Sequence, residues 1–412
     1  MKITYRAFLT LLVLLLLNQN FILAQNREIV RIVTYNILNY SDETRNSDFK
    51  KVLDEIKPDI VVVQEILTQY GVNVFRSGVL GDEYVAGPFI NGYDTDNAIF
   101  YKDSLITLID NRNIATALRD ISEYTLVHNF SGDTLIIYSV HLKASDSEPD
   151  RQKRLAEVTV LRNVTDNLPA GTNFMVIGDF NIYYANEPAY QKLINQSTPG
   201  YILDTQPAGN WHNNIAYASL HTQSTCGLFS GCPNGGSGGG MDDRFDMMLF
   251  SQAVSDTGGI TYVADSYIPF GNDGQHLNNS INDPPFNVIT QQVADALYNA
   301  SDHLPVYADF DFGFVSDVEI MTADKMNYLL QQNYPNPFNP TTTIKFTISD
   351  LRFTILKVYD VLGNEVATLV NEVKQAGNYE VEFDGSGLPS GIYIYRLITA
   401  NFSDSKKLIL LK

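Results

Sequence analysis

The feature that most constrains this chain is a short apolar run that ends in polar residues. The run from Phe174 to Ile177 is followed by Gly178, which is the pattern of a buried strand. Asp179 and Asn181 come next and are two residues apart, so they point the same way if the chain stays extended. A carboxylate and an amide at a strand end suit a magnesium ion and a phosphate oxygen. An Asx-turn is the alternative explanation of this pair.

Other apolar segments of the chain end in the same way. Each is rich in β-branched residues, as strands are, and each delivers a polar side chain at its end. The strand expected over 28–35 ends at Asn36, the strand over 59–64 at Glu65, and the strand over 134–140 at His141, with Lys143 two residues later. Ligands of α/β sheets bind at the carboxyl ends of strands. These side chains are therefore expected to share one rim.

Two helices are predicted from the spacing of apolar residues. The first covers 49–56, with Ser47 as the expected N-cap and Pro58 as the stop. The second, over 151–168, connects the strand that precedes His141 to the strand at 174–177. A helix between two such strands is consistent with a parallel crossover.

Two later segments place their polar residues before the strand instead of after it. Asp246 precedes an apolar strand that runs to residue 250, and Asp302 and His303 precede one that runs to residue 310. If these residues share the rim, their strands run in the opposite direction. We therefore expect mixed sheets and not an all-parallel doubly wound fold. A further strand is expected over 98–102, with Asn97 in the turn before it.

The N-terminus indicates export. Lys2 and Arg6 precede a short apolar core, and a small residue, Ala24, follows it, so residues 1–24 are interpreted as a secretory signal peptide. The core is too short to span a membrane, and no later stretch is long enough either. A chain of 412 residues has room for two or three domains.

The composition limits the kind of surface the protein presents. The net charge of −19 argues against a surface coated with basic contacts to nucleic acid. It does not exclude a nuclease, because a metal ion and a few local cations supply a phosphate-binding field.

Residues 206–240 are expected to be an irregular insertion on the substrate side. Its two cysteines, Cys226 and Cys232, are the only ones in the chain and are expected to form a disulfide. A two-cysteine zinc site is the weaker alternative, because no suitable further ligands complete it. His212 and His221 lie in the same insertion and are interpreted as ordinary residues of a polar loop.

After residue 313 the composition changes. Residues 314–330 are expected to be a linker. Residues 331–412 contain short alternating runs separated by turn signals such as Leu362-Gly363-Asn364, which predicts a small β-sandwich.

Taken in order, these motifs resemble the endonuclease/exonuclease/phosphatase superfamily, whose members include deoxyribonucleases, phosphatases and sphingomyelinases. The resemblance spans about residues 27–313 and covers six motifs, which are centred on Asn36, Glu65, His141, Asp179-Phe-Asn181, Asp246 and Asp302-His303. It implies a domain over residues 25–313 in the form of a two-sheet mixed α/β sandwich flanked by helices.

The resemblance also implies roles for single residues. Glu65 resembles the main magnesium ligand, with Asn36 and Asp302 assisting on the metal side. Asp179 would orient and deprotonate the attacking water. Asn181 and Lys143 would contact phosphate oxygens. His303, oriented by Asp246, would contact the scissile phosphate, and His141 would be a second phosphate-side imidazole. One departure is that no acidic partner can be assigned to His141.

The C-terminal block resembles the sorting domain of the type IX secretion system. The segment Asn333-Tyr-Pro-Asn-Pro-Phe-Asn-Pro340 and the strand that begins at Gly391 carry this resemblance. It implies the secretion machinery as a partner and a secreted or cell-surface location. A generic adhesive β-domain is the alternative.

The expected function is a secreted, magnesium-dependent phosphodiesterase, in the first place an extracellular endonuclease. Manganese and calcium are alternatives to magnesium. A phosphatase, a sphingomyelinase-like lipid phosphodiesterase and an inactive surface binding module are the rival functions. The sequence does not tell DNA from RNA and gives no signal for an oligomeric state.

Overall fold

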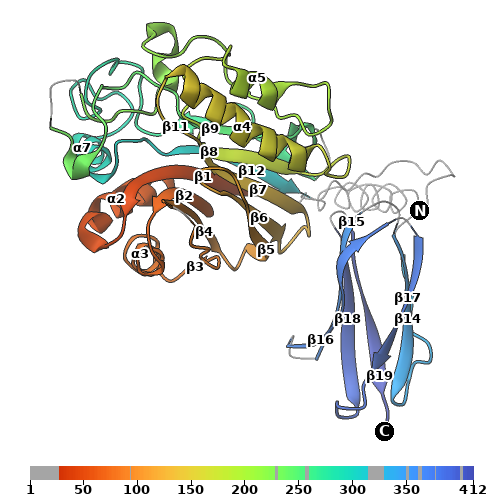
Figure 1. Cartoon of the computed structure of the whole chain (residues 1–412). Helices are drawn as coiled ribbons and strands as arrows, with labels where there is room; N and C mark the ends of the chain where they lie inside the picture. Colours follow the sequence, from red (N-terminus) through yellow and green to blue (C-terminus); the bar gives the residue numbers. More distant parts are fainter. Residues whose placement is uncertain are drawn as a thin grey trace, which may run out of the picture.

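The computed structural model describes residues 27–92, 94–227, 231–255, 259–313, 329–348, 352–360, 364–375, 377–399 and 402–412. The predicted signal peptide and most of the predicted linker lie outside these residues. Within them, the chain forms a mixed α/β domain that reaches Gly313 and a β-sandwich that begins at Leu329 (Figure 1).

The first sheet of the α/β domain has seven strands. Its order is β10-β12-β1-β2-β4-β3, with β11 beside β12. Only β1 and β2 pair in parallel, while β12 runs antiparallel to β1, as the order of its polar residues predicted. The strands are β1 (Arg27–Tyr40), β2 (Ile60–Ile66), β3 (Tyr84–Ala86), β4 (Asp96–Lys102), β10 (Ile260–Tyr262), β11 (Ile268–Pro269) and β12 (Val306–Gly313).

The second sheet has five strands in the order β5-β6-β7-β8-β9. The pair β7 and β8 is parallel, which confirms the predicted crossover, and β9 is antiparallel to β8. Its strands are β5 (Ile106–Ile114), β6 (Ile121–His128), β7 (Thr134–His141), β8 (Phe174–Asp179) and β9 (Asp246–Phe250). The predicted mixed α/β sandwich is therefore confirmed.

Three layers of apolar side chains hold the domain together. The central layer lies between the two sheets and joins residues such as Ile32 and Val62 to Ile137 and Met248. Burying one such side chain contributes about 1.5–3 kcal/mol. The outer layers pack helices on the sheets, so the domain is a four-layered sandwich.

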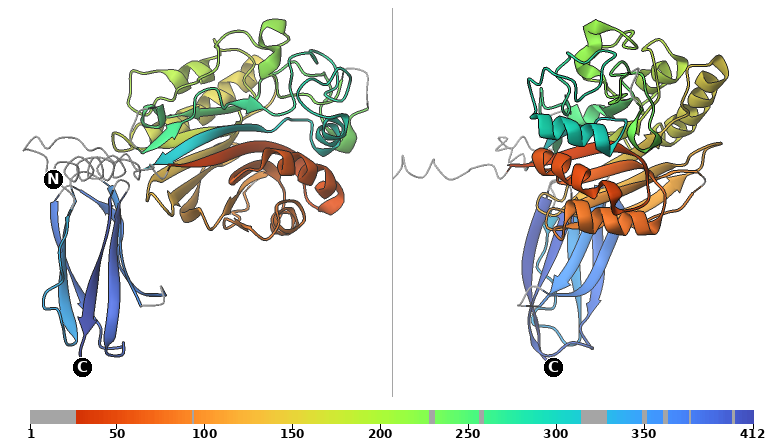
Figure 2. Two further views of the ribbon diagram at one scale, coloured as in Figure 1. Left: turned by 180° about the vertical axis from the view of Figure 1, so that it is seen from behind. Right: turned by 90° about the vertical axis from the view of Figure 1, so that its left-hand side faces the viewer.

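Helices α2 (Asn46–Ile56), α3 (Gln69–Phe75) and α7 (Gln291–Ala300) cover the seven-stranded sheet. Helices α4 (Glu148–Thr165) and α5 (Pro188–Ile194) cover the five-stranded sheet. A short helix, α6 (Gln252–Ser255), follows β9. Figure 2 shows the same layering from behind and from the side, with the orange helices α2 and α3 on the outside.

Three local predictions were wrong. Ser47 lies inside α2 and does not cap it, because a 3₁₀ turn over Glu43–Arg45, capped by Asp42, leads directly into the helix. Asn97 lies inside β4 and is buried, and its side chain donates to the backbone oxygen of Ser139. The first strand does not stop at Asn36 but continues to Tyr40, with an irregular register beyond Asn36.

Helix α4 buries charged side chains that the spacing of its apolar residues did not indicate. Arg154 is fully buried and pairs with Glu187 at 2.6 Å, while the neighbouring apolar residue Leu155 is only half-buried. Arg154 also donates to the backbone oxygens of Lys143 and Ser145. The helix therefore fixes the loop that follows β7.

The C-terminal unit is a sandwich of two small sheets, ordered β13-β14-β17 and β16-β15-β18-β19. Strand β13 lies in the last two residues of the stretch expected to be linker, and it pairs with β14. The strands are β13 (Leu329–Leu330), β14 (Thr341–Ile348), β15 (Arg352–Tyr359), β16 (Glu365–Lys374), β17 (Gly377–Asp384), β18 (Gly391–Thr399) and β19 (Phe402–Leu410).

Cys226 and Cys232 form a disulfide, which confirms the predicted pairing and excludes the zinc alternative. In the part of the chain that the structure describes, no helix combines the length and the apolar character needed to span a membrane.

Candidate active site

The predicted polar residues meet at one end of the two sheets. Strands β1, β2, β7 and β8 deliver side chains at or near their carboxyl ends, whereas β9 begins at Asp246 and β12 begins at Val306, shortly after Asp302 and His303. The opposite direction of β9 and β12 is what lets their first residues reach the same rim.

Backbone irregularities aim two of these side chains. Glu65 has φ 62°, and the register of β2 against β4 shifts between Val63 and Ile66, so Glu65 lies in a bulge that turns its side chain. Gly178 has φ 133°, and a Cβ built there would lie 2.1 Å from the backbone oxygen of Val140. Only glycine permits β7 and β8 to approach this closely beside Asp179.

Asn36 lies at the centre of the cluster. Its amide nitrogen donates to a carboxylate oxygen of Glu65 at 3.0 Å and to one of Asp179 at 3.1 Å. Its amide oxygen accepts from the backbone N–H of Leu38 and so points away from the carboxylates. In this arrangement Asn36 holds two carboxylates together and does not present a ligand oxygen to a metal ion.

His303 and Asp246 form a buried pair. Nδ1 of His303 lies 2.7 Å from Oδ2 of Asp246, and Asp246 is fully buried. Burial lowers the pKa of His303, but the charges of Asp246 and Asp179 outweigh it and hold this pKa well above its ordinary value. Asp246 therefore fixes the orientation of the ring and stabilises its charged form.

Gln223 completes the surroundings of His303. Its amide nitrogen lies 2.7 Å from Nε2 of His303. Turned by 180°, the amide presents its oxygen instead, so Gln223 accepts from a charged ring or donates to a neutral one. Sequence reasoning missed this residue because it lies in the irregular insertion.

His141 has the opposite electrostatic character. Burial, followed by the charges of Arg119, His303 and Lys143, holds the pKa of His141 well below its ordinary value, so its ring is neutral. Nε2 lies 3.6 Å from both Glu65 and Asp179. The site therefore pairs a charged imidazole with a neutral one.

The partner of Nδ1 of His141 is the hydroxyl of Thr95, at 3.4 Å. Among the described residues, no carboxylate lies at this nitrogen. The departure noted in the sequence is thus a threonine in place of an acid. Thr95 precedes β4 in a stretch whose sequence gives no strand signal, so nothing pointed to it.

Asp179 is buried between these groups. Burial raises the pKa of Asp179 to about 7, and the negative charges of Asp246 and Glu65 act in the same direction, while His303 and Asn36 oppose them. A carboxylate with a pKa near neutrality is suited to accept a proton from water. The backbone N–H of Asn181 donates to Asp179 at 3.0 Å, and the Asn181 side chain donates to the backbone oxygen of Leu142.

Asp302 is held by the glycine-rich segment 233–240 of the insertion. The backbone N–H of Ser237 donates to its Oδ2 at 2.7 Å. Its other oxygen, Oδ1, is buried and has no hydrogen-bond partner among the described residues. Such an oxygen is costly unless a cation or a water meets it. With Glu65 it offers the hard oxygen donors that magnesium prefers, so the residues present fit a divalent metal ion.

Lys143 does not join the cluster directly. Its ammonium group donates to the backbone oxygen of Ala144 and lies 3.7 Å from Asp150. The predicted contact with phosphate therefore requires the side chain to turn.

The two histidines of the insertion differ. His221 is buried, and its ring nitrogens face the backbone oxygens of Met241 and Trp211, which is a structural role. His212 is one-third exposed and bonds Asp243 at 2.7 Å. His212, Asp243 and Asp242 have ligand atoms within 4.8 Å of one another, but His212 is already engaged by Asp243.

Comparison with known families gives two matches. The model of the Endonuclease/Exonuclease/phosphatase family matches residues 33–303, a span that contains all the clustered side chains. The model of the secretion system C-terminal sorting domain matches residues 332–411. No curated protein sequence matches the chain.

Solved structures of similar fold come from several organisms. TDP2 of D. rerio complexed with a single-strand DNA product is 16% identical, with 69% of this chain and 99% of that chain covered and a TM-score of 0.47. The human Nocturnin catalytic domain is 20% identical, with 70% and 97% covered and a TM-score of 0.43. A Bacteroides thetaiotaomicron mannosyl-6-phosphatase is 12% identical, with 68% and 99% covered and a TM-score of 0.45.

Proposed function

Because the chain belongs to the endonuclease/exonuclease/phosphatase family and carries a type IX secretion sorting domain, we propose that it is an exported, divalent-metal-dependent phosphodiesterase that hydrolyses nucleic acid. Members of this family are phosphoric ester hydrolases. Magnesium is the proposed ion and an endonuclease the proposed activity.

One observation carries this proposal: six side chains from five strand ends form a single, largely buried cluster of complementary charge. Its acidic half is Glu65, Asp179 and Asp302, and its other half is the His303–Asp246 pair with neutral His141 beside it. A binding module would have no need to bury this many titratable groups together, because each costs desolvation free energy.

The metal ion would be held by Glu65 and Asp302. When bound, it neutralises negative charge on the phosphate and polarises the P–O bond. Asn36 keeps the Glu65 and Asp179 carboxylates in place through its amide nitrogen. It is proposed as a positioning residue and not as a direct ligand.

The remaining steps belong to the chain's own side chains. Asp179 accepts the proton of the attacking water at its carboxylate. When the phosphate takes the place of Gln223 at Nε2 of His303, the charged ring donates a hydrogen bond to a non-bridging phosphate oxygen, where negative charge grows in the transition state. Neutral His141 donates a hydrogen bond from its ring N–H to a phosphate oxygen and so stabilises the transition state. Asn181 and Lys143 are the proposed further phosphate contacts.

The test is hydrolysis by the Asp179→Asn variant. It keeps the volume of the side chain but removes the base, so we expect a loss of at least about 100-fold in kcat on nucleic acid, with an unchanged circular dichroism spectrum. Asp54→Asn is the matched control, because it removes one exposed carboxylate on α2 without touching the cluster. A folded Asp179→Asn protein with wild-type turnover would rule out the proposed role of Asp179.

A further inference from the structure

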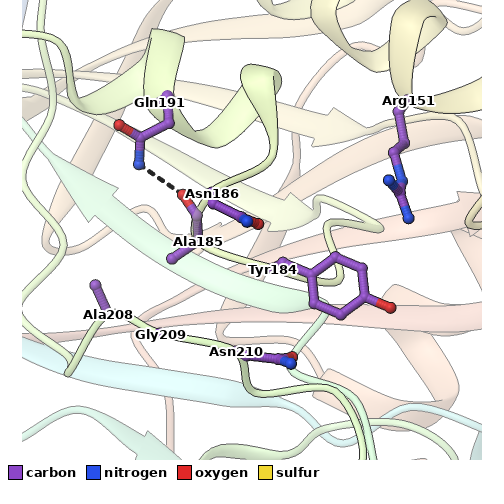
Figure 3. Close-up of a pocket in the computed structure, with 8 residues that line it drawn as sticks. All are labelled: Arg151, Tyr184, Ala185, Asn186, Gln191, Ala208, Gly209 and Asn210. Atoms are coloured by element: carbon purple, nitrogen blue, oxygen red, sulfur yellow. Dashed lines mark hydrogen bonds between the residues drawn. The ribbon is translucent and has the colours of Figure 1, made fainter. Parts of the chain in front are cut away.

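A cavity outside the cluster lies at the carboxyl end of β7 and β8. Its volume is about 620 Å³, within the range of small-molecule sites. The residues that follow β8, the start of α4 and the loop 208–210 line it (Figure 3). None of its lining residues has a role in the proposed hydrolysis.

The frame of this pocket is rigid. Tyr184 and Asn210 form an antiparallel bridge, and the backbone N–H of Ala185 donates to the oxygen of Gly209. Trp211, which follows Asn210, is fully buried and donates from its indole nitrogen to the backbone oxygen of Ile182. These bonds fix the two loops against each other before any ligand binds.

A short series of neighbouring residues connects the pocket to the cluster. The backbone of Gln223 bridges to those of His303 and Asp243, and the amide nitrogen of Gln223 lies 2.7 Å from Nε2 of His303. His212, bonded to Asp243, packs against Tyr184 with ring centroids 5.9 Å apart.

The pocket and the cluster are also close to each other along the chain. Tyr184 comes three residues after Asn181, a separation of at most about 11 Å. The pocket is therefore within reach of the nucleotide next to a phosphate held at the cluster.

The positive charge of Arg151 in the pocket is neutralised by a neighbouring carboxylate. Arg151 lies over the Tyr184 ring, 5.4 Å from its centroid, and its charge is paired with Asp146 at 2.8 Å. The hydroxyl of Tyr184 also donates to Asp146. A second phosphate would find no unpaired cation here, whereas an uncharged planar group meets the Tyr184 ring, one side of which faces the Arg151 guanidinium.

Two amide side chains that line the pocket are available for hydrogen bonds to a ligand. Among the described residues, the side chains of Asn186 and Asn210 have no hydrogen-bond partner, and both line the pocket. A primary amide offers a donor and an acceptor side by side, which matches the edge of a nucleobase.

We propose that this pocket binds the base of the nucleotide that flanks the scissile phosphodiester, with Tyr184 as the stacking surface and Asn186 and Asn210 as contacts to the base edge. The inference rests on the proposed nucleic-acid substrate. It also explains how a chain with a net charge of −19 retains such a substrate, because base contacts replace the usual excess of phosphate contacts.

The test compares a single-stranded oligonucleotide with the same oligonucleotide carrying one abasic tetrahydrofuran residue. The wild-type protein is expected to cut the bond beside the abasic residue about 5- to 150-fold more slowly than the matching bond of the intact strand, the loss expected for one base–aromatic stack. Tyr184→Ala should lower cutting of the intact strand to the abasic level and remove the difference. Tyr184→Phe, which keeps the ring, should preserve it.

Tyr70→Ala is the control, because Tyr70 is an exposed tyrosine on α3 outside the pocket. It should behave as wild type. The inference is overturned if the wild type cuts both strands equally, or if Tyr184→Ala keeps the discrimination. A pocket that holds the sugar instead would give equal cutting of both strands and an equal loss for both in Tyr184→Ala. If the wild type cuts no nucleic acid at all, the proposed function has failed, and the inference fails with it.

Discussion

Replacing Asp246 by asparagine removes the charge that holds His303 in its protonated form. The two side chains are 2.7 Å apart and both are buried. At a charge separation of about 4 Å and an effective dielectric constant of about 20, their attraction is about 4 kcal/mol. A charge-assisted hydrogen bond contributes about 1.5–3 kcal/mol by mutational measurement. We therefore expect a loss of about 2–4 kcal/mol in the stabilisation of the charged ring.

This loss of stabilisation determines how far the pKa of His303 and the value of kcat/KM should fall. Since one pKa unit is about 1.36 kcal/mol, the pKa of His303 should fall by about 1.5 to 3 in Asp246→Asn. If the charged ring stabilises the transition state, kcat/KM at neutral pH should fall by about 30- to 1,000-fold. The alkaline limb of the pH–rate profile should move to lower pH, because burial then lowers the pKa of His303 with less opposition.

The pH dependence of the protein's stability should also reflect the His303–Asp246 pair. The pKa of His303 is higher in the folded chain than the unfolded value of about 6.5. The stabilisation by the pair is therefore complete below about pH 6.5 and is lost as the pH rises through the folded pKa. The difference in Tm between wild type and Asp246→Asn should be largest near pH 6 and should shrink at alkaline pH.

The assay is a pH series of kcat/KM on an oligonucleotide together with thermal unfolding of each variant. Asp204→Asn is the matched control, since it breaks another buried pair, Asp204 with Arg244 at 2.7 Å. It should lower the stability without moving the alkaline limb. A folded Asp246→Asn protein with the wild-type pH profile would refute the reasoning.

Three further outcomes are expected. Gly178→Ala places a Cβ against the backbone oxygen of Val140 and should lower the free energy of unfolding by about 2–5 kcal/mol, as measured by urea denaturation; full stability would show that β7 and β8 can separate. Glu65→Gln should weaken magnesium binding more than tenfold by calorimetry, and unchanged affinity would exclude Glu65 as a ligand. Thr95→Val removes the hydroxyl at Nδ1 of His141 and should lower kcat by up to about tenfold without a change in Tm, whereas an unchanged kcat would leave His141 oriented by packing alone.

Much of the fold was predictable because it follows from the local pattern of apolar strands with polar residues at their ends. Apolar strands that end in Asn36, Glu65, His141 and Asp179 required one common rim, and the reversed order at Asp246 fixed the direction of β9. These predictions used only the period of the strands and the position of polar residues at their ends. The same logic predicted the parallel pair β7 and β8 and the mixed character of the sheets.

The remaining features depend on contacts between residues far apart in the sequence. Thr95 and Gln223 lie beside the two imidazoles because distant segments of the chain place them there. Arg154 lies on the buried face of α4 because Glu187 compensates its charge, a pairing that apolar spacing does not indicate. The turn of Lys143 towards Ala144 and Asp150 is likewise set by the loop that α4 fixes.

The bulge at Glu65 is another such feature. A one-residue register shift between β2 and β4 turns the side chain towards Asn36 and His141. The sequence of β2 predicts a continuous buried strand. The partner strand decides where the irregularity falls, so the strand pattern alone could not locate it.

The most direct measurement is hydrolysis by the purified chain on plasmid DNA, RNA, sphingomyelin and a phosphomonoester side by side, with magnesium, after chelation and after magnesium is restored. We expect cutting of nucleic acid that chelation abolishes, that magnesium restores and that Asp179→Asn lacks. Activity on the lipid or the monoester alone would keep the site and contradict the proposed substrate. A folded protein that binds magnesium and hydrolyses none of the four would contradict the proposed phosphodiesterase activity itself.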